Sequence, residues 1–160
     1  DTAGLHATHF STDRLVLVVA RGHPLARRRR IAFAETLEHD YIGMHTGSTL
    51  QAYLNRITEQ MGRTLKLRIQ LTSFDAMCRM VSGGVGIGVV PESAARRNLQ
   101  AMKLAQIELT DEWKWRERRV LVREGDTLPG YAQDLIEMLC RHFDHPPGLR
   151  EKPHTEQRKP

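Results

Sequence analysis

The feature that most constrains this fold is a repeated change in the spacing of apolar residues. From Leu65 to Leu71 they occupy every second position, as in a strand with one buried face, whereas from Leu50 to Met61 they recur at the spacing of one helical face. Both patterns return along the chain. We expect helices at 48–61, 72–82 and 92–98, and strands at 40–43, 65–71 and 87–90. Alternating elements of this kind predict a doubly wound α/β sheet with right-handed crossovers.

The segments on either side of this region also carry element signals. Continuous β-branched and aliphatic residues predict a buried strand at 15–20, and Pro129 fits the first turn of a final helix. Further elements are expected as a helical turn at 33–37, an extended segment at 102–109, a strand at 118–123 and a helix at 128–143. The alternation in Trp113-Lys114-Trp115-Arg116 predicts a strand with both indoles on one face. Residues 145–160 are polar with little to bury, which predicts a disordered tail.

The composition excludes several classes of protein. At 160 residues, 40% hydrophobic and 27% charged, the chain has the profile of a soluble globular domain, and no apolar run is long enough to span a membrane. Cys78 and Cys140 lie far apart without metal-ligand spacing, which favours buried apolar residues in a reducing compartment, the cytoplasm. Much of the net charge of +5 comes from Arg27–Arg30 and the C-terminal tail, a pattern typical of solvated segments. We therefore expect no direct contact of this chain with DNA.

Three strand-to-helix junctions are expected at one edge of the sheet, beyond the carboxyl ends of the strands, where ligands of α/β sheets bind. They lie at 44–49, 72–74 and 91–92. Ser48 with Gln51, and Thr72 with Asp75, fit capping boxes at the first two helix starts. Helix starts present unpaired N–H groups and a partial positive charge, and a cap hydroxyl keeps its O–H to donate. This edge therefore predicts a site for a small anion.

The sequence lacks the motifs that would indicate catalysis, a cofactor or a metal site. The glycines from Gly83 to Gly88 follow a helix and precede a strand, the reverse of a dinucleotide fingerprint, and indicate a helix stop with a close backbone approach. Ser48 beside His45 lacks both the nucleophile-elbow pattern and a carboxylate that would orient the imidazole. The eight histidines are scattered without ligand spacing. We expect no enzyme activity, no cofactor and no metal.

Two runs of sequence resemble a known family. Residues 13–26 closely resemble the crossover strand of the effector-binding domain of LysR-type transcriptional regulators, and residues 81–91 resemble that family's helix–glycine–strand segment. The spacing of Thr46-Gly47-Ser48 and Thr72-Ser73-Phe74 between these runs also fits. The resemblance covers residues 5–143, and the two runs together are more specific than either alone.

The resemblance implies an α/β fold like that of type II periplasmic binding proteins, with one complete lobe and the returning part of the other. In this arrangement 1–14 lead in from the incomplete first lobe, 15–104 form the second lobe, 105–144 return to the first, and 145–160 form the tail. The effector contacts that the family implies are Thr46, Gly47, Ser48, Thr72, Ser73 and Phe74. Since most of one cleft wall is then missing, we expect weak or undetectable effector binding by these residues alone.

The implied partners are a small effector, expected to be a carboxylate or another anion, and DNA, which is reached only through a missing helix-turn-helix domain. The chain begins at Asp1 without an initiator Met, and we expect a piece of a longer protein. Effector binding would shift the lobes or the dimer arrangement and so change how the missing domains sit on DNA. Apolar surface left by the missing lobe predicts a homo-oligomer. A solute-binding protein of a transporter is the alternative, and an enzyme is a more distant one.

Overall fold

The structure is a computed structural model that describes residues 4–144. The described chain forms two compact units, a larger one at 12–116 and a smaller one from 4–11 and 117–144. The larger unit extends beyond the 15–104 expected for the second lobe and includes the strand at 104–109. The tail predicted from residue 145 onward lies outside the described residues.

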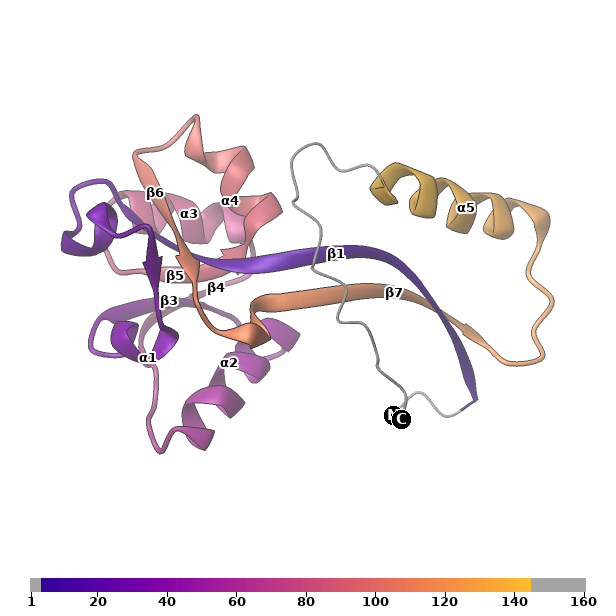
Figure 1. Cartoon of the computed structure of the whole chain (residues 1–160), viewed down its shortest axis with the longest axis horizontal. Coiled ribbons are helices and arrows are strands. Elements are labelled where there is room, and N and C mark those ends of the chain that lie inside the picture. Colours follow the sequence, from indigo (N-terminus) through magenta and orange to yellow (C-terminus); the bar gives the residue numbers. More distant parts are fainter. Residues whose placement is uncertain (1–3, 145–160) are drawn as a thin grey trace, which may run out of the picture. The chain divides into compact units, whose positions relative to one another are not determined.

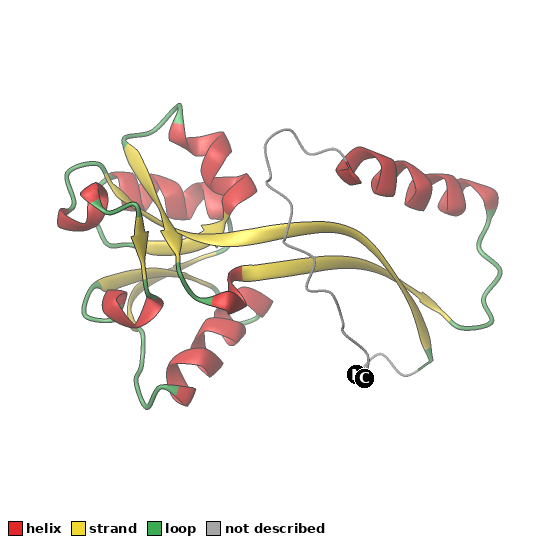
Figure 2. Ribbon diagram, viewed as in Figure 1, coloured by secondary structure: helices red, strands yellow, loops and turns green. Residues whose placement is uncertain are grey.

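The elements follow the predicted order (Figures 1 and 2). The strands are β1 (Leu5–Ala20), β2 (Arg30–Ile31), β3 (Asp40–Met44), β4 (Lys66–Leu71), β5 (Gly88–Pro91), β6 (Leu104–Leu109) and β7 (Trp115–Arg123). The helices are α1 (Phe33–Thr36), α2 (Thr49–Gln60), α3 (Phe74–Ser82), α4 (Glu92–Leu99) and α5 (Gly130–Asp144), with 3-10 turns at Pro24–Arg27 and Glu112–Lys114. The first strand begins at Leu5, well before the predicted start at Leu15.

The sheet of the larger unit is mixed. Its strands run in the order β2-β6-β1-β5, and the parallel pair β3-β4 joins β5 through a parallel bridge between Tyr41 and Ile87. The central strand β1 is antiparallel to both β5 and β6. The parallel pairing expected for the sheet is therefore found between β3 and β4, at the bridge beside β5, and between β2 and β6. The carboxyl ends of β3, β4 and β5 share one edge, and the segments at 45–48, 72–73 and 91–92 follow them.

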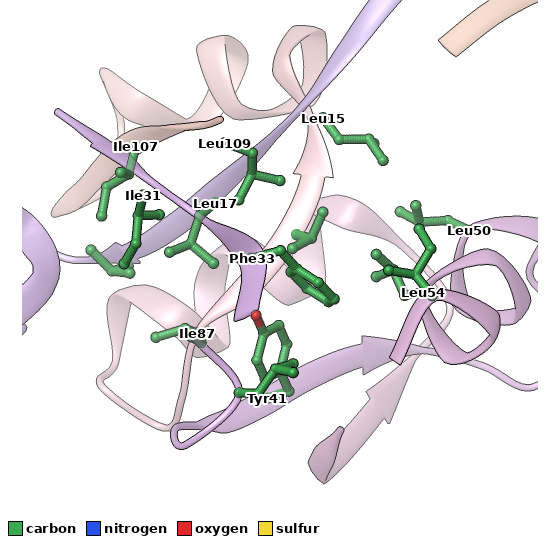
Figure 3. Packing of buried hydrophobic residues seen from close by; sticks show 14 residues of the cluster. Leu15, Leu17, Ile31, Phe33, Tyr41, Leu50, Leu54, Ile87, Ile107 and Leu109 are labelled. Atoms are coloured by element: carbon green, nitrogen blue, oxygen red, sulfur yellow. The ribbon is translucent and has the colours of Figure 1, made fainter. Parts of the chain in front are cut away.

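Alternate side chains of β1 enter two hydrophobic clusters of the larger unit. Leu15 and Leu17 join buried residues of α1, α2, β2 and β6, as Figure 3 shows around Phe33. Val16 and Val18 join a second cluster that includes residues of α3 and α4. Each of these side chains is nearly or fully buried, and full burial of such a side chain stabilises the fold by about 1.5–3 kcal/mol. An apolar residue at every position of this run is what a strand covered on both faces requires.

The segment around the two tryptophans corrects a prediction. Glu112–Lys114 form a 3-10 turn, and β7 begins only at Trp115. The indole of Trp113 packs edge-on against Phe33, with ring centroids 5.1 Å apart, and against Tyr53, at 5.9 Å. Burying this large ring against the core outweighs the local alternation. The predicted strand with two indoles on one face is therefore wrong.

The smaller unit contains the first part of β1, which pairs with β7, together with helix α5. One side of α5 packs inward, and Phe143 contacts Phe10 edge-on at a centroid distance of 5.6 Å. Its other side carries Tyr131, Leu135 and Met138, which are 78%, 53% and 63% exposed. This apolar face of α5 is open to solvent within the described chain.

Candidate functional site

Five of the six predicted site residues lie in two loops at the carboxyl ends of neighbouring parallel strands, and Phe74 is the first residue of α3. β3 and β4 pair as far as Met44 opposite Leu71, so the β3–α2 loop (45–48) and the β4–α3 loop (72–73) begin side by side. The backbone N–H of His45 donates to the carbonyl of Leu71 at 2.8 Å and joins the two loops at their bases. The structure thus brings together the two sets of residues that are separate in sequence.

The six predicted effector contacts differ in their exposure to solvent. Thr46, Gly47, Thr72 and Ser73 are exposed, and Ser48 and Phe74 are half-buried. Phe74 packs against both core clusters, so it ties the start of α3 to the body of the unit. Gly47 lies against the exposed imidazole of His45, because a Cβ atom at Gly47 would be 3.3 Å from the ring. His45 is therefore an exposed side chain of the same loop beside the predicted contacts. The sequence suggested for it only the role of a catalytic base, which no motif supported.

The start of α3 is capped one residue later than predicted. Ser73 Oγ accepts the backbone N–H of Ala76 at 3.2 Å, so Ser73 is the cap and Thr72 precedes it. Asp75 does not return a bond to Thr72 but accepts from the side-chain amide of Asn98 at 2.8 Å. The predicted Thr72–Asp75 capping box is therefore wrong. Ser73 retains its own O–H, which can donate to a ligand.

The predicted Ser48–Gln51 capping box at the start of α2 is also wrong. Ser48 has extended backbone angles (φ −77°, ψ 129°) at the N-cap, but its hydroxyl makes no cap hydrogen bond. The predicted partner Gln51 is only 2% exposed and points elsewhere: its Oε1 accepts the backbone N–H of Met44 at 3.0 Å. The Ser48 hydroxyl therefore has both its donor and its acceptor capacity available at the loop.

The third junction, at the start of α4, contains a buried carboxylate of the protein itself. Glu92 begins α4, and Arg14 Nε and Nη2 donate to its two oxygens at 2.9 and 2.7 Å. Gln106 Nε2 donates at 2.8 Å, and Arg96 lies 3.5 Å away. Burial raises the pKa of Glu92, but the hydrogen bonds from Arg14 and Gln106 and the positive charges of Arg14 and Arg96 outweigh it and hold the pKa below its ordinary value. The donors of Arg14 and Gln106 at this junction are therefore already engaged by Glu92.

Other parts of the described chain contain different features. Between residues 4 and 144, no three His, Cys, Asp or Glu side chains are grouped so that they could hold a metal ion. None of the helices in this range has the length and hydrophobicity needed to cross a bilayer. An open hollow of about 490 Å³ in the smaller unit is lined by β1, β7 and α5, including His6 and Arg123. It contains none of the predicted site residues.

Comparison with known proteins identifies relatives among transcriptional regulators. Residues 1–144 match the family described as the LysR substrate binding domain. A RuBisCO operon transcriptional regulator of Allochromatium vinosum is 25% identical over 124 residues, which is 78% of this chain and 41% of that protein. The protein of the same name from Acidithiobacillus ferrooxidans is 31% identical over 112 residues, 68% of this chain and 36% of that protein. The chain thus spans about two fifths of the length of these relatives.

Solved structures share the fold. The effector-binding domain of QuiR in complex with shikimate superimposes with a TM-score of 0.77 at 18% identity, covering 90% of this chain and 68% of that one. The regulatory domain of Synechocystis PCC6803 CcmR in complex with 2-PG gives 0.78 at 21% identity, covering 87% and 67%. The predicted periplasmic-binding-protein-like α/β fold is confirmed. Taken with the family match along residues 1–144, this shows that the chain belongs to the LysR substrate-binding domain family, the effector-binding part of LysR-type transcriptional regulators.

Proposed function

We propose that this chain senses a small anionic effector at the β3–α2 and β4–α3 loops. The observation that carries the proposal is the pairing of two helix starts through the His45–Leu71 hydrogen bond, which places donor groups of both loops together. The proposed contacts are Thr46, Gly47, Ser48, Thr72, Ser73 and Phe74. Backbone N–H groups and hydroxyls at helix starts favour a negatively charged oxygen, and the first turn of α2 contains no carboxylate that would oppose it.

The solved relatives support this class of ligand without identifying the ligand of this chain. The QuiR domain was solved with shikimate and the CcmR domain with 2-PG, and shikimate is a carboxylate. We infer that a carboxylate or a phosphorylated acid of similar size is the effector here. The other wall of the cleft would come from segments outside these residues, so the present chain alone should bind weakly.

Effector binding would serve regulation and not transport or catalysis. The family and the named relatives are transcriptional regulators, which favours sensing over solute transport. We propose that DNA is bound by another part of a longer, cytoplasmic, homo-oligomeric protein. The effector acts by binding one arrangement of that protein more tightly than another, since equal affinity for both would shift nothing.

An NMR titration tests the proposed site. Acetate, shikimate and inorganic phosphate are added separately to the isotope-labelled chain, and we expect amide shifts at 45–50 and 72–76. Ser48→Ala should weaken this binding roughly tenfold because it removes a hydroxyl donor to a charged ligand. Ser82→Ala is the matched control, since Ser82 lies at the opposite end of α3 and bonds the carbonyl of Arg79. Shifts confined to other regions, or an equal loss in Ser82→Ala, would refute the assignment.

A further inference from the structure

Two glutamine side chains hold the backbone N–H and C=O of Met44, the last residue of β3, where the β3–α2 loop begins. Gln51 Oε1 accepts the N–H of Met44 at 3.0 Å, and Gln70 Nε2 donates to the carbonyl of Met44 at 3.0 Å. Gln51 is 2% exposed, and its own Nε2 donates to Asn55 Oδ1 at 2.9 Å, so both ends of the buried amide are bonded. A fully satisfied buried amide holds its neighbours in one arrangement.

The position of Gln51 follows from the way β3 parts from β5. Successive N–H groups of a strand point to opposite sides, and the N–H of Ile42 donates to the carbonyl of Ile87, the residue before β5, at 2.8 Å. The N–H of Met44 is directed to the same side, but the pairing of β3 on that side is an isolated bridge between Tyr41 and Ile87. The amide oxygen of Gln51 occupies the place that a β5 carbonyl would otherwise fill.

The backbone at Gly43 leaves space for this amide. A Cβ atom at Gly43 would lie 2.5 Å from Gln51 Oε1 and 2.6 Å from a methyl carbon of Leu67. Gly43, next to the N–H that Gln51 accepts, and the buried Gln51 in the first turn of α2 therefore form a matched pair. Both residues are buried, so we infer that their arrangement acts on the loop and not directly on a ligand.

We propose that Gln51 is a positioning residue for the β3–α2 loop. By accepting the N–H of Met44, it holds residues 45–48 so that their donors are in the binding conformation. The inference rests on the proposed function and deepens it. A loop that is already ordered loses less conformational entropy on binding, so loss of the Gln51 bond should lower affinity even though Gln51 does not touch the ligand.

The experiment compares Gln51→Met, which removes the acceptor, with Gln51→Glu, which retains one. Hydrogen exchange of the Met44 and His45 amides is measured without ligand, and inorganic phosphate binding is then followed by NMR. In Gln51→Met we expect exchange of the Met44 amide to accelerate by roughly tenfold or more, and phosphate affinity to fall by roughly tenfold. Gln51→Glu should keep the amide protected but still bind phosphate less well, because it places a negative charge beneath the loop.

Thr58→Val is the matched control, since Thr58 is a buried residue of the same helix whose hydroxyl bonds the carbonyls of Leu54 and Asn55. Unchanged Met44 exchange in Gln51→Met would overturn the inference, and so would equal effects of Thr58→Val on exchange and affinity. If Gln51→Met does not fold, Asn55→Ala removes only the partner of the amide and should give an intermediate loss of protection. If the wild-type chain shows no phosphate shifts, the proposed function fails, while exchange still decides whether Gln51 orders the loop.

Discussion

An Arg14→Met variant would leave the carboxylate of Glu92 buried without its main partner. The Glu92 side chain is 3% exposed, and its remaining partners are Gln106 and Arg96, of which Arg96 is 44% exposed and 3.5 Å away. Removing one member of a buried ion pair costs about 3–5 kcal/mol, and the two remaining partners place this case near 3 kcal/mol. For a chain of this size that corresponds to a fall of roughly 6–12 °C in Tm.

The pH dependence gives a sharper test than the size of the effect. In the wild type the pKa of Glu92 lies below its ordinary value of 4.5, so its stabilisation is present above pH 4.5 and lost as the pH falls through the folded-state pKa. Without Arg14, burial should dominate and raise the pKa of Glu92 above 4.5. The variant then gains a proton where the wild type does not, and the stability difference between the two should shrink as the pH falls from 7 to 4.5.

Urea unfolding followed by tryptophan fluorescence measures this difference at several pH values. Glu92→Gln should cost about 1 kcal/mol, since Arg14 is 25% exposed and can recruit water. The double variant Arg14→Met with Glu92→Gln should recover about 1–2 kcal/mol relative to Arg14→Met, because no unpaired buried charge remains. A loss below about 1 kcal/mol in Arg14→Met, or a loss that does not change with pH, would show that the ion pair does not hold the start of α4.

Three further predictions follow from single positions. Ser73→Ala should lower the free energy of unfolding by about 1 kcal/mol, whereas Ser48→Ala should change it by less than about 0.5 kcal/mol, because only Ser73 caps its helix; urea unfolding of both variants compares them, and equal losses would contradict the cap assignment. Gly86→Ala should lower Tm through a cost of about 1–3 kcal/mol, since its Cβ would lie 2.6 Å from the carbonyl oxygen of Asp40; an unchanged melting curve would show that the strands can separate freely. Burial raises the pKa of Cys78 to about 11, so a thiol-reactive dye at pH 8 should modify Cys78 only after unfolding, as mass spectrometry of the labelled peptides would report.

Elements whose pattern reflects their own burial could be predicted from the sequence. The alternation at 65–71 and the helical spacing at 50–61 both match the structure, and Gly62 ends α2 with a left-handed φ of 66°. The predicted close backbone approach near Gly86 is also confirmed. In each case the deciding interaction is between neighbours in sequence or between a strand and the core that covers it.

The roles of Gln51 and Glu92 could not be predicted, because both depend on distant partners. Ser48 and Gln51 have the local spacing of a capping box, but the acceptor is needed at Met44, where β3 has parted from β5. The sequence around Glu92 is that of an ordinary helix start with an acidic residue in its first turn, but the partner of Glu92 is Arg14, 78 residues away on β1. A local pattern predicts which bond a side chain can make, and the tertiary structure decides which bond it makes.

The three helix starts at this sheet edge have similar backbone geometry but different charge. The first turn of α4 holds the buried carboxylate of Glu92, and the first turn of α3 holds the exposed Asp75, which Asn98 engages. The first turn of α2 has no acidic residue, and the hydroxyl of Ser48 is not used as a cap. At α4 the donors of Arg14 and Gln106 are already engaged by Glu92, and at α3 solvent screens the charge of Asp75. The absence of an acidic residue from the first turn of α2 therefore supports the proposal that the ligand binds at the β3–α2 loop, where we propose that Gln51 acts.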